Sequence, residues 1–218
     1  MNELLPRERT ELTEGAVHVP DWLDQSRQRE LVEACRDWAK GPVPMASPTL
    51  PSGATMSLQM VCLGWHWIPY RYVKVNEAGQ EAAAFPDWMR TLARDAVKEA
   101  LGDTSEYASY QPDAALINFY GADAKLGQHQ DKDECSGAPV VSLSLGDNCI
   151  FRFGNTETRN RPYTDLELRS GDLFVFGGPA RLAYHGVTKV MPRTGPPDIG
   201  LDTGRLNITI RQTGLQPD

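Results

Sequence analysis

The second half of the chain consists of short β-rich runs separated by turn residues, and no other feature constrains the fold as strongly. The runs begin at Ala114, Pro139, Cys149, Asp172, Ala183 and Arg205. Several short strands without alternating helices are typical of an antiparallel sandwich or barrel. We therefore predict a β-sandwich core over residues 113–214, with residues 192–204 as a loop between its last two strands.

The first half contains two segments in which apolar residues recur at helical spacing. One helix is predicted from about Asp24 to Ala39, before a Gly/Pro-rich stretch. A second is predicted to open at Pro86 and to close at Gly102. Residues 1–112 are thus an N-terminal helical extension, and we expect the extension and the core to form one compact unit.

Composition and charge exclude several classes of protein. The formal net charge is −7, so we do not expect a broad basic surface for gripping duplex DNA. No apolar run approaches the roughly 20 residues that span a bilayer, and the polar N-terminus lacks the apolar region of a secretory signal. The four cysteines show no CxxC spacing, which favours free thiols in a reducing cytosol. We expect a cytoplasmic protein with no membrane association.

Three residues have the identity and spacing of a metal site. His129 and Asp131 are two positions apart, so on an extended segment their side chains point the same way. His185 could supply a third ligand from a later strand. Two histidines and one carboxylate on one face form the facial triad of non-haem Fe(II) oxygenases. The alternative is a solvated polar turn together with a histidine satisfied in the core.

The last β-rich run carries two arginines on one face. Arg205, Asn207 and Arg211 share that face under the period of two of a strand. Arginines on the inward face are costly to bury without anionic partners, and guanidinium groups bind carboxylates bidentately. A dicarboxylate beside a facial triad suggests 2-oxoglutarate, with Asn118 and Tyr120 suited to share its pocket. The alternative is a stripe of polar residues that faces solvent.

These residues lie within stretches that resemble a known family. The run LINFYGADAKLGQHQDKDE, from Leu116 to Glu134, is similar to the core signature of AlkB-type dioxygenases, which repair alkylated nucleic acids. Further matches follow in order as PVVSLSLG, IFRFG, SGDLFVFGG, RLAYHGV and RLNITIRQTG, and upstream ATMSLQM and LGW resemble the bacterial members. The similarity extends from about Gly53 to Gly214.

The resemblance implies a fold that is mostly β with flanking helices. Its core would be a double-stranded β-helix, or jelly roll, with an N-terminal α/β extension that forms a nucleotide-recognition lid at about residues 53–85. It also implies a role for each matching residue. Fe(2+) would be held by His129, Asp131 and His185, and 2-oxoglutarate by Asn118, Tyr120, Arg205, Asn207 and Arg211. The substrate residues would be Trp65, which stacks on the extruded base, Tyr70 and Tyr72 in the lid, Asp133 against the damaged base, and Arg159.

Some features of this match leave alternatives open. Matching Tyr70 and Tyr72 needs a two-residue gap after Trp65, and without the resemblance this stretch would be a partly buried β-hairpin. Arg205 is favoured for the distal carboxylate of 2-oxoglutarate and Arg211 for the carboxylate at the metal, but spacing does not decide between them.

By resemblance, the predicted function is oxidative demethylation of N-alkylated bases of the 1-methyladenine and 3-methylcytosine type. The reaction would use Fe(II), O2 and 2-oxoglutarate and release formaldehyde, succinate and CO2. The expected partner is alkylated single-stranded DNA, with RNA, or duplex DNA read by base flipping, as further substrates of a monomeric enzyme. One alternative is a hydroxylase or demethylase acting on a protein or small molecule. Another is a catalytically silent β-sandwich binding module.

Overall fold

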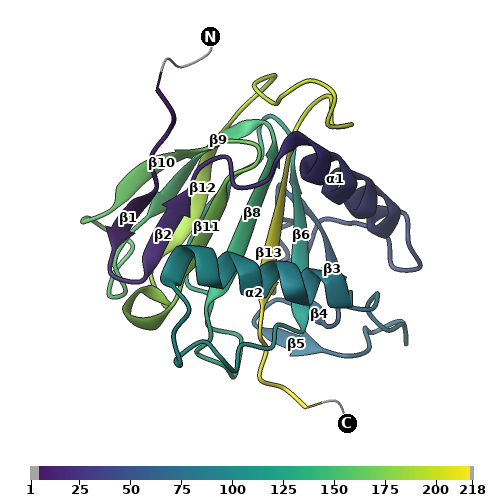
Figure 1. Cartoon of the computed structure of the whole chain (residues 1–218). Helices are drawn as coiled ribbons and strands as arrows, with labels where there is room; N and C mark the ends of the chain where they lie inside the picture. Colours follow the sequence, from purple (N-terminus) through teal and green to yellow (C-terminus); the bar gives the residue numbers. More distant parts are fainter. Residues whose placement is uncertain (1–4, 217–218) are drawn as a thin grey trace.

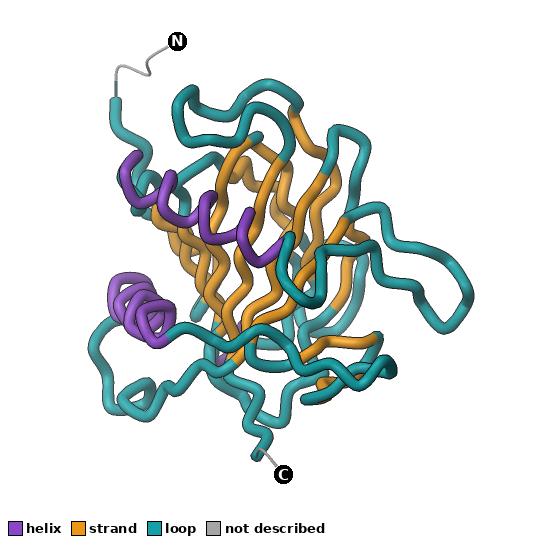
Figure 2. The backbone as a smooth tube through the Cα atoms, turned by 90° about the vertical axis from the view of Figure 1, so that its right-hand side faces the viewer, coloured by secondary structure: helices purple, strands orange, loops and turns teal. Residues whose placement is uncertain are grey.

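Two helices lie across one face of a large antiparallel sheet, and a smaller sheet lies behind it (Figure 1). The computed structural model describes residues 5–216. The first four residues of the predicted N-terminal extension, which also belong to the segment predicted to lack a secretory signal, lie outside this range. Figure 2 shows the two helices on the same side of the strands. The arrangement is therefore layered as helices, larger sheet and smaller sheet.

Both helices form where the sequence predicts them. Helix α1 spans Gln25–Ala39, and the side chain of Asp24 caps it by accepting the backbone N–H of Arg27 at 2.8 Å. Helix α2 spans Asp87–Leu101 and ends at Gly102, whose φ of 90° suits a residue without a Cβ. Neither these nor any other helix in residues 5–216 has the length and apolar character needed to cross a bilayer.

The strands form two facing sheets. The larger sheet has the order β1 (Thr10–Thr13), β2 (Ala16–Val19), β11 (Leu173–Phe176), β8 (Val140–Gly146), β13 (Arg205–Arg211), β6 (Ala114–Tyr120) and β3 (Gln59–Leu63). The smaller sheet has the order β10 (Thr164–Leu168), β9 (Asn148–Phe153), β12 (His185–Met191) and β7 (Leu126–His129). Strands β4 (His66–Ile68) and β5 (Arg71–Val73) form a separate hairpin, which we call the lid hairpin, and a short 3-10 helix covers Gly178–Ala180.

The two sheets confirm the predicted jelly-roll class, and all six predicted β-rich runs are strands. The N-terminal part contributes more strand than its helical periodicity suggests. Strands β1 and β2 extend the larger sheet beyond β11, and β3 forms its other edge beside β6. These strands are only four or five residues long, so pairing with the central strands, more than local composition, holds them extended.

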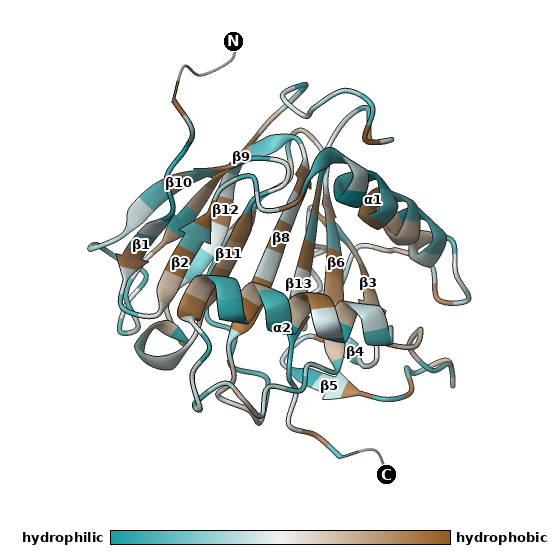
Figure 3. Cartoon of the chain, viewed as in Figure 1, coloured by the Kyte–Doolittle hydropathy of each residue, from teal (hydrophilic) through white to brown (hydrophobic). Residues whose placement is uncertain are grey.

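Apolar side chains fill two separate layers. Between the helices and the larger sheet, Leu31 and Met89 pack in one cluster with Ile208 and Ile210 of β13. Between the sheets lies a second cluster, rich in phenylalanine, in which the rings of Phe153 and Phe174 are 5.1 Å apart. Figure 3 shows hydrophobic residues recurring along β8, β11 and β13 beneath the helices. Strand β13 therefore gives alternate residues to each layer.

A buried carboxylate anchors the N-terminal segment to the core. Asp172 is fully buried and accepts two hydrogen bonds of 2.7 Å from Arg7. Its Oδ2 also lies 2.9 Å from Nε2 of His18, and the backbone N–H groups of Asp21 and Arg169 donate to the same carboxylate. Burial alone would raise the pKa of Asp172, but the hydrogen bonds from His18 and Arg7 hold it at about 2.

We predict that Asp172→Asn lowers the free energy of unfolding at pH 7 by roughly 3 kcal/mol, because Arg7 and His18 lose their buried anionic partner. Since the folded pKa lies below the unfolded value of about 3.9, the stabilisation is complete above about pH 4 and is lost as the pH falls toward 2. Urea unfolding at pH 7 and at low pH should show the gap between wild type and variant closing. The exposed Asp165, paired with Arg152, is the control, and Asp165→Asn should cost at most about 1 kcal/mol. A gap that persists at low pH would contradict the prediction.

Candidate active site

The three predicted metal ligands meet at one end of the smaller sheet. His129 is the last residue of β7, His185 is the first residue of β12, and the two are direct cross-strand partners. Asp131 follows β7 in the loop. One ligand atom from each residue lies within 4.8 Å of the others, which is close enough for a single ion. The strand pairing thus explains how residues far apart in the sequence form one site.

Both histidines present the same ring nitrogen to this site. Nδ1 of His129 lies 2.9 Å from the carbonyl oxygen of Gly127, and Nδ1 of His185 lies 2.9 Å from that of Ala183. A carbonyl oxygen can only accept, so each Nδ1 carries the proton and each Nε2 keeps its lone pair. Burial lowers the pKa of His185 to about 4, which keeps this ring neutral at pH 7. Metal-binding histidines are usually oriented in this way.

Asp131 is ionised although it is buried. Burial alone would raise its pKa, but the guanidinium of Arg211 holds the pKa well below its ordinary value. Nη2 of Arg211 lies 2.8 Å from Oδ2 of Asp131. Two imidazoles and one carboxylate are a donor set that suits a divalent transition metal.

The inward face of β13 lines a small inner pocket beside these ligands. Arg205, Asn207, Thr209 and Arg211 all border it, as the strand alternation predicts. Its free volume is only about 40 Å³, and it includes His129, Asp131 and His185 in its wall. The pocket therefore places the polar face of β13 directly next to the metal ligands.

Arg205 is the least satisfied charge in this pocket. Arg205 is 1% exposed, and within residues 5–216 its side-chain hydrogen bond runs from Nη2 to Oγ of Ser144 at 2.9 Å. Its Nε and Nη1 are buried without a partner. A buried cation with unpartnered N–H donors fits an anionic carboxylate ligand. Arg205 thus has free donors and no carboxylate partner among the described residues, whereas Arg211 already contacts a carboxylate.

The neutral polar residues of the pocket differ in how many of their hydrogen-bonding atoms remain unused. Asn207 donates from its amide to Ser142 and to the backbone of Leu143, and it accepts from Thr209, so its polar atoms are already in use. Asn118, on β6, keeps its Oδ1 buried and unpartnered. Tyr120 also lines the pocket, and burial raises the pKa of its hydroxyl, which therefore stays protonated. The cosubstrate roles predicted for these residues remain predictions.

A larger outer cavity of about 280 Å³ opens next to the inner pocket and shares several walls with it. The residues that line both are Asn118, Leu126, His129, Asp131 and Arg211. Tyr70, Asp133 and Arg159 lie on the outer cavity only, as does Trp67 of the lid hairpin. The structure thus brings three of the five predicted substrate residues to the cavity beside the metal ligands.

The other two predicted substrate residues lie elsewhere. Trp65 is 6% exposed, its indole Nε1 donates to Asp113 at 3.0 Å, and Nζ of Lys74 lies 4.2 Å from the ring centroid. Tyr72 is buried with Trp65 and Leu116 in a small apolar cluster. Neither residue lines the outer cavity. A stacking role for Trp65 stays a prediction from the sequence resemblance.

Two functional candidates escaped the sequence analysis. Trp67 borders the outer cavity, and its Nε1 donates to Oδ2 of Asp133 at 2.8 Å. Glu134 is buried between Arg181 and Arg211. The available signals were the second tryptophan in the LGWHW run and the repeated carboxylates after Asp131, but neither pattern shows which residue faces the cavity.

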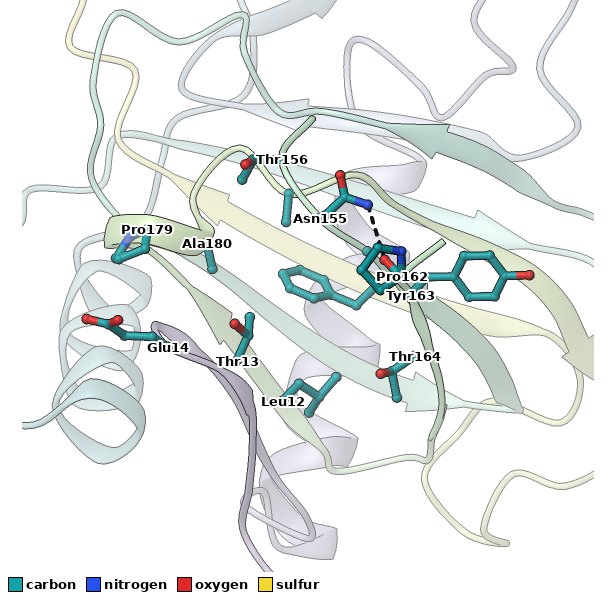
Figure 4. Close-up of a pocket in the computed structure, with 13 residues that line it drawn as sticks. Leu12, Thr13, Glu14, Asn155, Thr156, Pro162, Tyr163, Thr164, Pro179 and Ala180 are labelled. Carbon is teal, nitrogen blue, oxygen red and sulfur yellow. Dashed lines mark hydrogen bonds between the residues drawn. The ribbon is translucent and has the colours of Figure 1, made fainter. Parts of the chain in front are cut away.

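A third cavity, of about 390 Å³, lies apart from the metal ligands (Figure 4). Its wall comes from β1, from the connection between β9 and β10, and from the 3-10 helix. Asn155 and Pro162 border it, joined by a hydrogen bond of 3.2 Å from the Asn155 amide to the Pro162 carbonyl. Its lining residues include none of the predicted site residues.

Comparison with known proteins assigns the family. A family model described as the 2OG-Fe(II) oxygenase superfamily matches residues 15–211. The chain belongs to this superfamily. The superfamily's metal and cosubstrate, Fe(II) and 2-oxoglutarate, and its co-reactant O2 are therefore those of this chain.

Individual members of the superfamily resemble most of the chain. The chain is 40% identical over 178 residues to the α-ketoglutarate-dependent dioxygenase AlkB of Escherichia coli (strain K12), covering 78% of each protein. It is 32% identical over 217 residues to the DNA N(6)-methyladenine demethylase ALKBH1D of Arabidopsis thaliana, covering 90% of this chain but 49% of that protein. It thus spans about half the length of this plant relative. The solved structure of OsALKBH1 has a TM-score of 0.83 and 34% identity, covering 93% of this chain and 100% of that chain.

The residues of this 2OG-Fe(II) oxygenase are suited to hold both Fe(II) and 2-oxoglutarate. His129, Asp131 and His185 match the donors that Fe(II) takes in such enzymes, and all three would hold it at the wall of the inner pocket. The unpartnered donors of Arg205 suit the distal carboxylate of a dicarboxylate.

We predict that Arg205→Lys raises the Kd for 2-oxoglutarate at least about tenfold, because the fork is replaced by a point charge and charged hydrogen bonds contribute about 1.5–3 kcal/mol each. Calorimetry with Mn(II) in place of Fe(II) measures this without turnover. Arg152→Lys is the control, since Arg152 is partly exposed and its bidentate partner is the exposed Asp165. Equal Kd values for wild type and Arg205→Lys would remove Arg205 from the cosubstrate site.

Proposed function

We propose that the chain is an oxidative demethylase that removes methyl groups from nitrogen atoms of nucleic-acid bases. The reaction consumes O2 and 2-oxoglutarate and releases formaldehyde, succinate and CO2. The observation that carries the proposal is the pair of connected cavities. A small charged pocket, suited to a dicarboxylate, and a larger cavity with aromatic walls share the metal ligands His129 and Asp131. The names of the bacterial and plant relatives support the same reaction class.

In this proposal different residues of the chain bind Fe(II) and 2-oxoglutarate. His129, Asp131 and His185 would hold Fe(II), which supplies the oxidation of the methyl carbon when bound. Arg205 would bind the distal carboxylate of 2-oxoglutarate, and Arg211 would lie beside the carboxylate nearest the metal. The protein contributes position and electrostatics, while the metal and cosubstrate supply the oxidation.

The outer cavity would take a base that is outside a helix. A methyl group within a stacked duplex cannot reach a metal at the bottom of a cavity, so the base is flipped out or belongs to a single strand. Trp67 offers an aromatic wall, and its hydrogen bond fixes Oδ2 of Asp133, leaving Oδ1 for the exocyclic amino group of a base. We therefore assign the stacking role to Trp67 in place of Trp65, which is committed to Asp113.

Single strands are the proposed substrates of a monomeric, cytoplasmic enzyme. With a net charge of −7, the chain offers few cations for phosphate, and Lys132 and Arg159 are the basic residues beside Asp133 on the outer cavity. So small a phosphate contact offsets little of the few kcal/mol that flipping a paired base costs. All four cysteines, Cys35, Cys62, Cys135 and Cys149, are free thiols, which fits a reducing compartment.

The test is formaldehyde release from oligonucleotides that carry 1-methyladenine, 3-methylcytosine or N6-methyladenine, as DNA and as RNA. Wild type with Fe(II) and 2-oxoglutarate should release formaldehyde from at least one single strand, and omission of either should stop the reaction. His185→Ala should be inactive because one of three ligands is lost. His66→Ala is the matched control, since His66 is buried but bonds to the backbone of Gln80. Release of formaldehyde from a methylated peptide only would overturn the nucleic-acid proposal.

We predict that Trp67→Ala lowers kcat/KM for a methylated single strand by roughly tenfold or more, since stacking of one base on an aromatic ring contributes about 1–3 kcal/mol. The matched change is Trp65→Phe, which keeps a ring in the small cluster and loses only the hydrogen bond to Asp113. Its kcat/KM should stay near that of wild type. Steady-state kinetics of both variants on one oligonucleotide provide the comparison. A large loss for Trp65→Phe and none for Trp67→Ala would return the stacking role to Trp65.

We also predict that Asp133→Asn distinguishes charged from neutral bases. 1-Methyladenine and 3-methylcytosine are cationic near neutral pH, whereas N6-methyladenine is neutral, so only the first two gain from a carboxylate in the cavity wall. The loss of kcat/KM should be roughly tenfold or more for the cationic bases and clearly smaller for N6-methyladenine. Equal losses on both would indicate general damage to the cavity, and no loss on either would place Asp133 outside recognition.

A further inference from the structure

A second carboxylate is buried next to the metal ligand Asp131, and none of the predicted roles uses it. The side chain of Glu134 is 0% exposed although it lies in a loop. Its partners come from three separate segments: Tyr72 from the lid hairpin, Arg181 from the end of the 3-10 helix, and Arg211 from the end of β13. Convergence of so many elements on one buried charge is the observation that carries this inference.

Arg211 is shared between the two carboxylates. Its Nη2 lies 2.8 Å from Asp131, and its Nη1 lies 2.8 Å from Oε1 of Glu134. Nη1 also donates to the hydroxyl of Tyr72 at 2.9 Å, and that hydroxyl donates to Oε1 of Glu134 at 2.7 Å. Arg211, Glu134 and Tyr72 thus form a closed triangle of hydrogen bonds. The Nε of Arg211 is the nitrogen that remains without a partner.

Arg181 fixes the other side of Glu134. Its Nη2 donates to Oε2 at 2.9 Å, and its Nη1 donates to the backbone carbonyl of Asp131. Both oxygens of Glu134 are therefore bound by charged donors. Burial alone would raise the pKa of Glu134, but Arg211 is the main cause that holds it below its ordinary value, so the group is a carboxylate at neutral pH.

This geometry decides how strongly Arg211 competes with a metal for Asp131. With Glu134 present, the guanidinium charge is divided between two carboxylates. Without Glu134, Asp131 would be the one carboxylate left to Arg211 among the described residues, and the ion pair would oppose metal binding more strongly. The triangle also fixes the rotation of the guanidinium, and with it the direction of the free Nε.

We propose that Glu134 and Tyr72 are positioning residues of the iron and cosubstrate site, acting through Arg211. They hold Arg211 so that it orients Asp131 without withdrawing it from the metal, and so that Nε stays available to the cosubstrate. The inference rests on the metal and cosubstrate assignments of the proposed function, but not on the identity of the demethylated substrate. It gives Tyr72 a different role from the substrate contact that the family resemblance implies.

Tyr70 provides a natural contrast within the same hairpin. It lies two residues from Tyr72 but is 66% exposed, whereas Tyr72 is 7% exposed. Tyr70 lines the outer cavity, and its φ of 74° places it in the left-handed region that a bulky side chain rarely occupies. One tyrosine of the hairpin therefore faces the outer cavity, while the other faces the buried charges.

The experiment measures binding, without turnover, of Mn(II), of 2-oxoglutarate in the presence of Mn(II), and of a 1-methyladenine single strand. Glu134→Gln should raise the Kd for Mn(II) roughly tenfold or more, because Arg211 would then pair with Asp131 alone and the orientation of this ligand would be lost. Tyr72→Phe should raise the Kd for 2-oxoglutarate about 2–10-fold, since it removes one hydroxyl from the triangle. Strand affinity should stay at the wild-type value in both variants.

Two matched controls separate positioning from general stability and from substrate binding. Asp172→Asn removes a buried carboxylate whose side-chain partners, Arg7 and His18, line neither the inner pocket nor the outer cavity, and it should destabilise the fold without changing Mn(II) or 2-oxoglutarate affinity. Tyr70→Phe should leave both affinities unchanged.

The outcomes are distinct. Failure of wild type to bind Mn(II) and 2-oxoglutarate would overturn the proposed function and this inference with it. Wild-type binding together with unchanged Kd values in Glu134→Gln and Tyr72→Phe would overturn the inference alone. The same follows if Asp172→Asn weakens Mn(II) binding as much as Glu134→Gln does, or if Tyr72→Phe weakens only strand binding.

Discussion

The burial of two arginines between the sheets is the constraint on which the rest of the site depends. Arg205 and Arg211 stand at the two ends of β13, and the residues between them alternate between the helix-covered layer and the inner pocket. An unpaired guanidinium in such a place is strongly unfavourable, so each must be compensated. The structure compensates Arg211 with Asp131 and Glu134, and it leaves Arg205 with a single neutral partner, Ser144. Arg211 is therefore held in place by the protein's own carboxylates, whereas Arg205 is left to bind a carboxylate ligand.

The parts of the site that depend on strand alternation and pairing could be predicted from the sequence. The shared face of Arg205, Asn207 and Arg211 follows from the period of two of a strand. The expectation that His129 and His185 act as ligands of one metal follows from the family signature, and the two residues are cross-strand partners in the structure. The residues that escaped prediction depend on contacts between distant segments. Glu134, which has no role in the sequence analysis, meets Tyr72, for which a substrate contact is predicted, across 62 positions of the chain, and no local pattern specifies that meeting.

In the lid segment, two tryptophans that are close in the sequence have different side-chain partners. Trp65 and Trp67 are two positions apart, so a strand that shared one face would present both rings to the same side. Trp65 precedes the hairpin and Trp67 lies within β4, and Trp67 packs against the cluster that contains Trp65, yet their indole N–H groups donate to different carboxylates. Trp65 then packs on β6 with Lys74 over its ring, while Trp67 reaches Asp133. The sequence spacing alone therefore does not show which of the two rings lines the outer cavity.

The buried charges also explain why metal and cosubstrate belong together in this site. Three arginines, Arg181, Arg205 and Arg211, face two carboxylates, Asp131 and Glu134, while the burial-lowered pKa of His185 keeps that ligand neutral. A divalent cation alone would add two positive charges to a site that already has an excess of one, and a dicarboxylate alone would reverse that excess. Bound together, Fe(II) and 2-oxoglutarate leave the net charge of the buried cluster unchanged. Since isolated charges are expensive at low dielectric, each ligand lowers the electrostatic cost of binding the other. The carboxylates that position Arg211 thereby also set the charge balance that makes joint binding favourable.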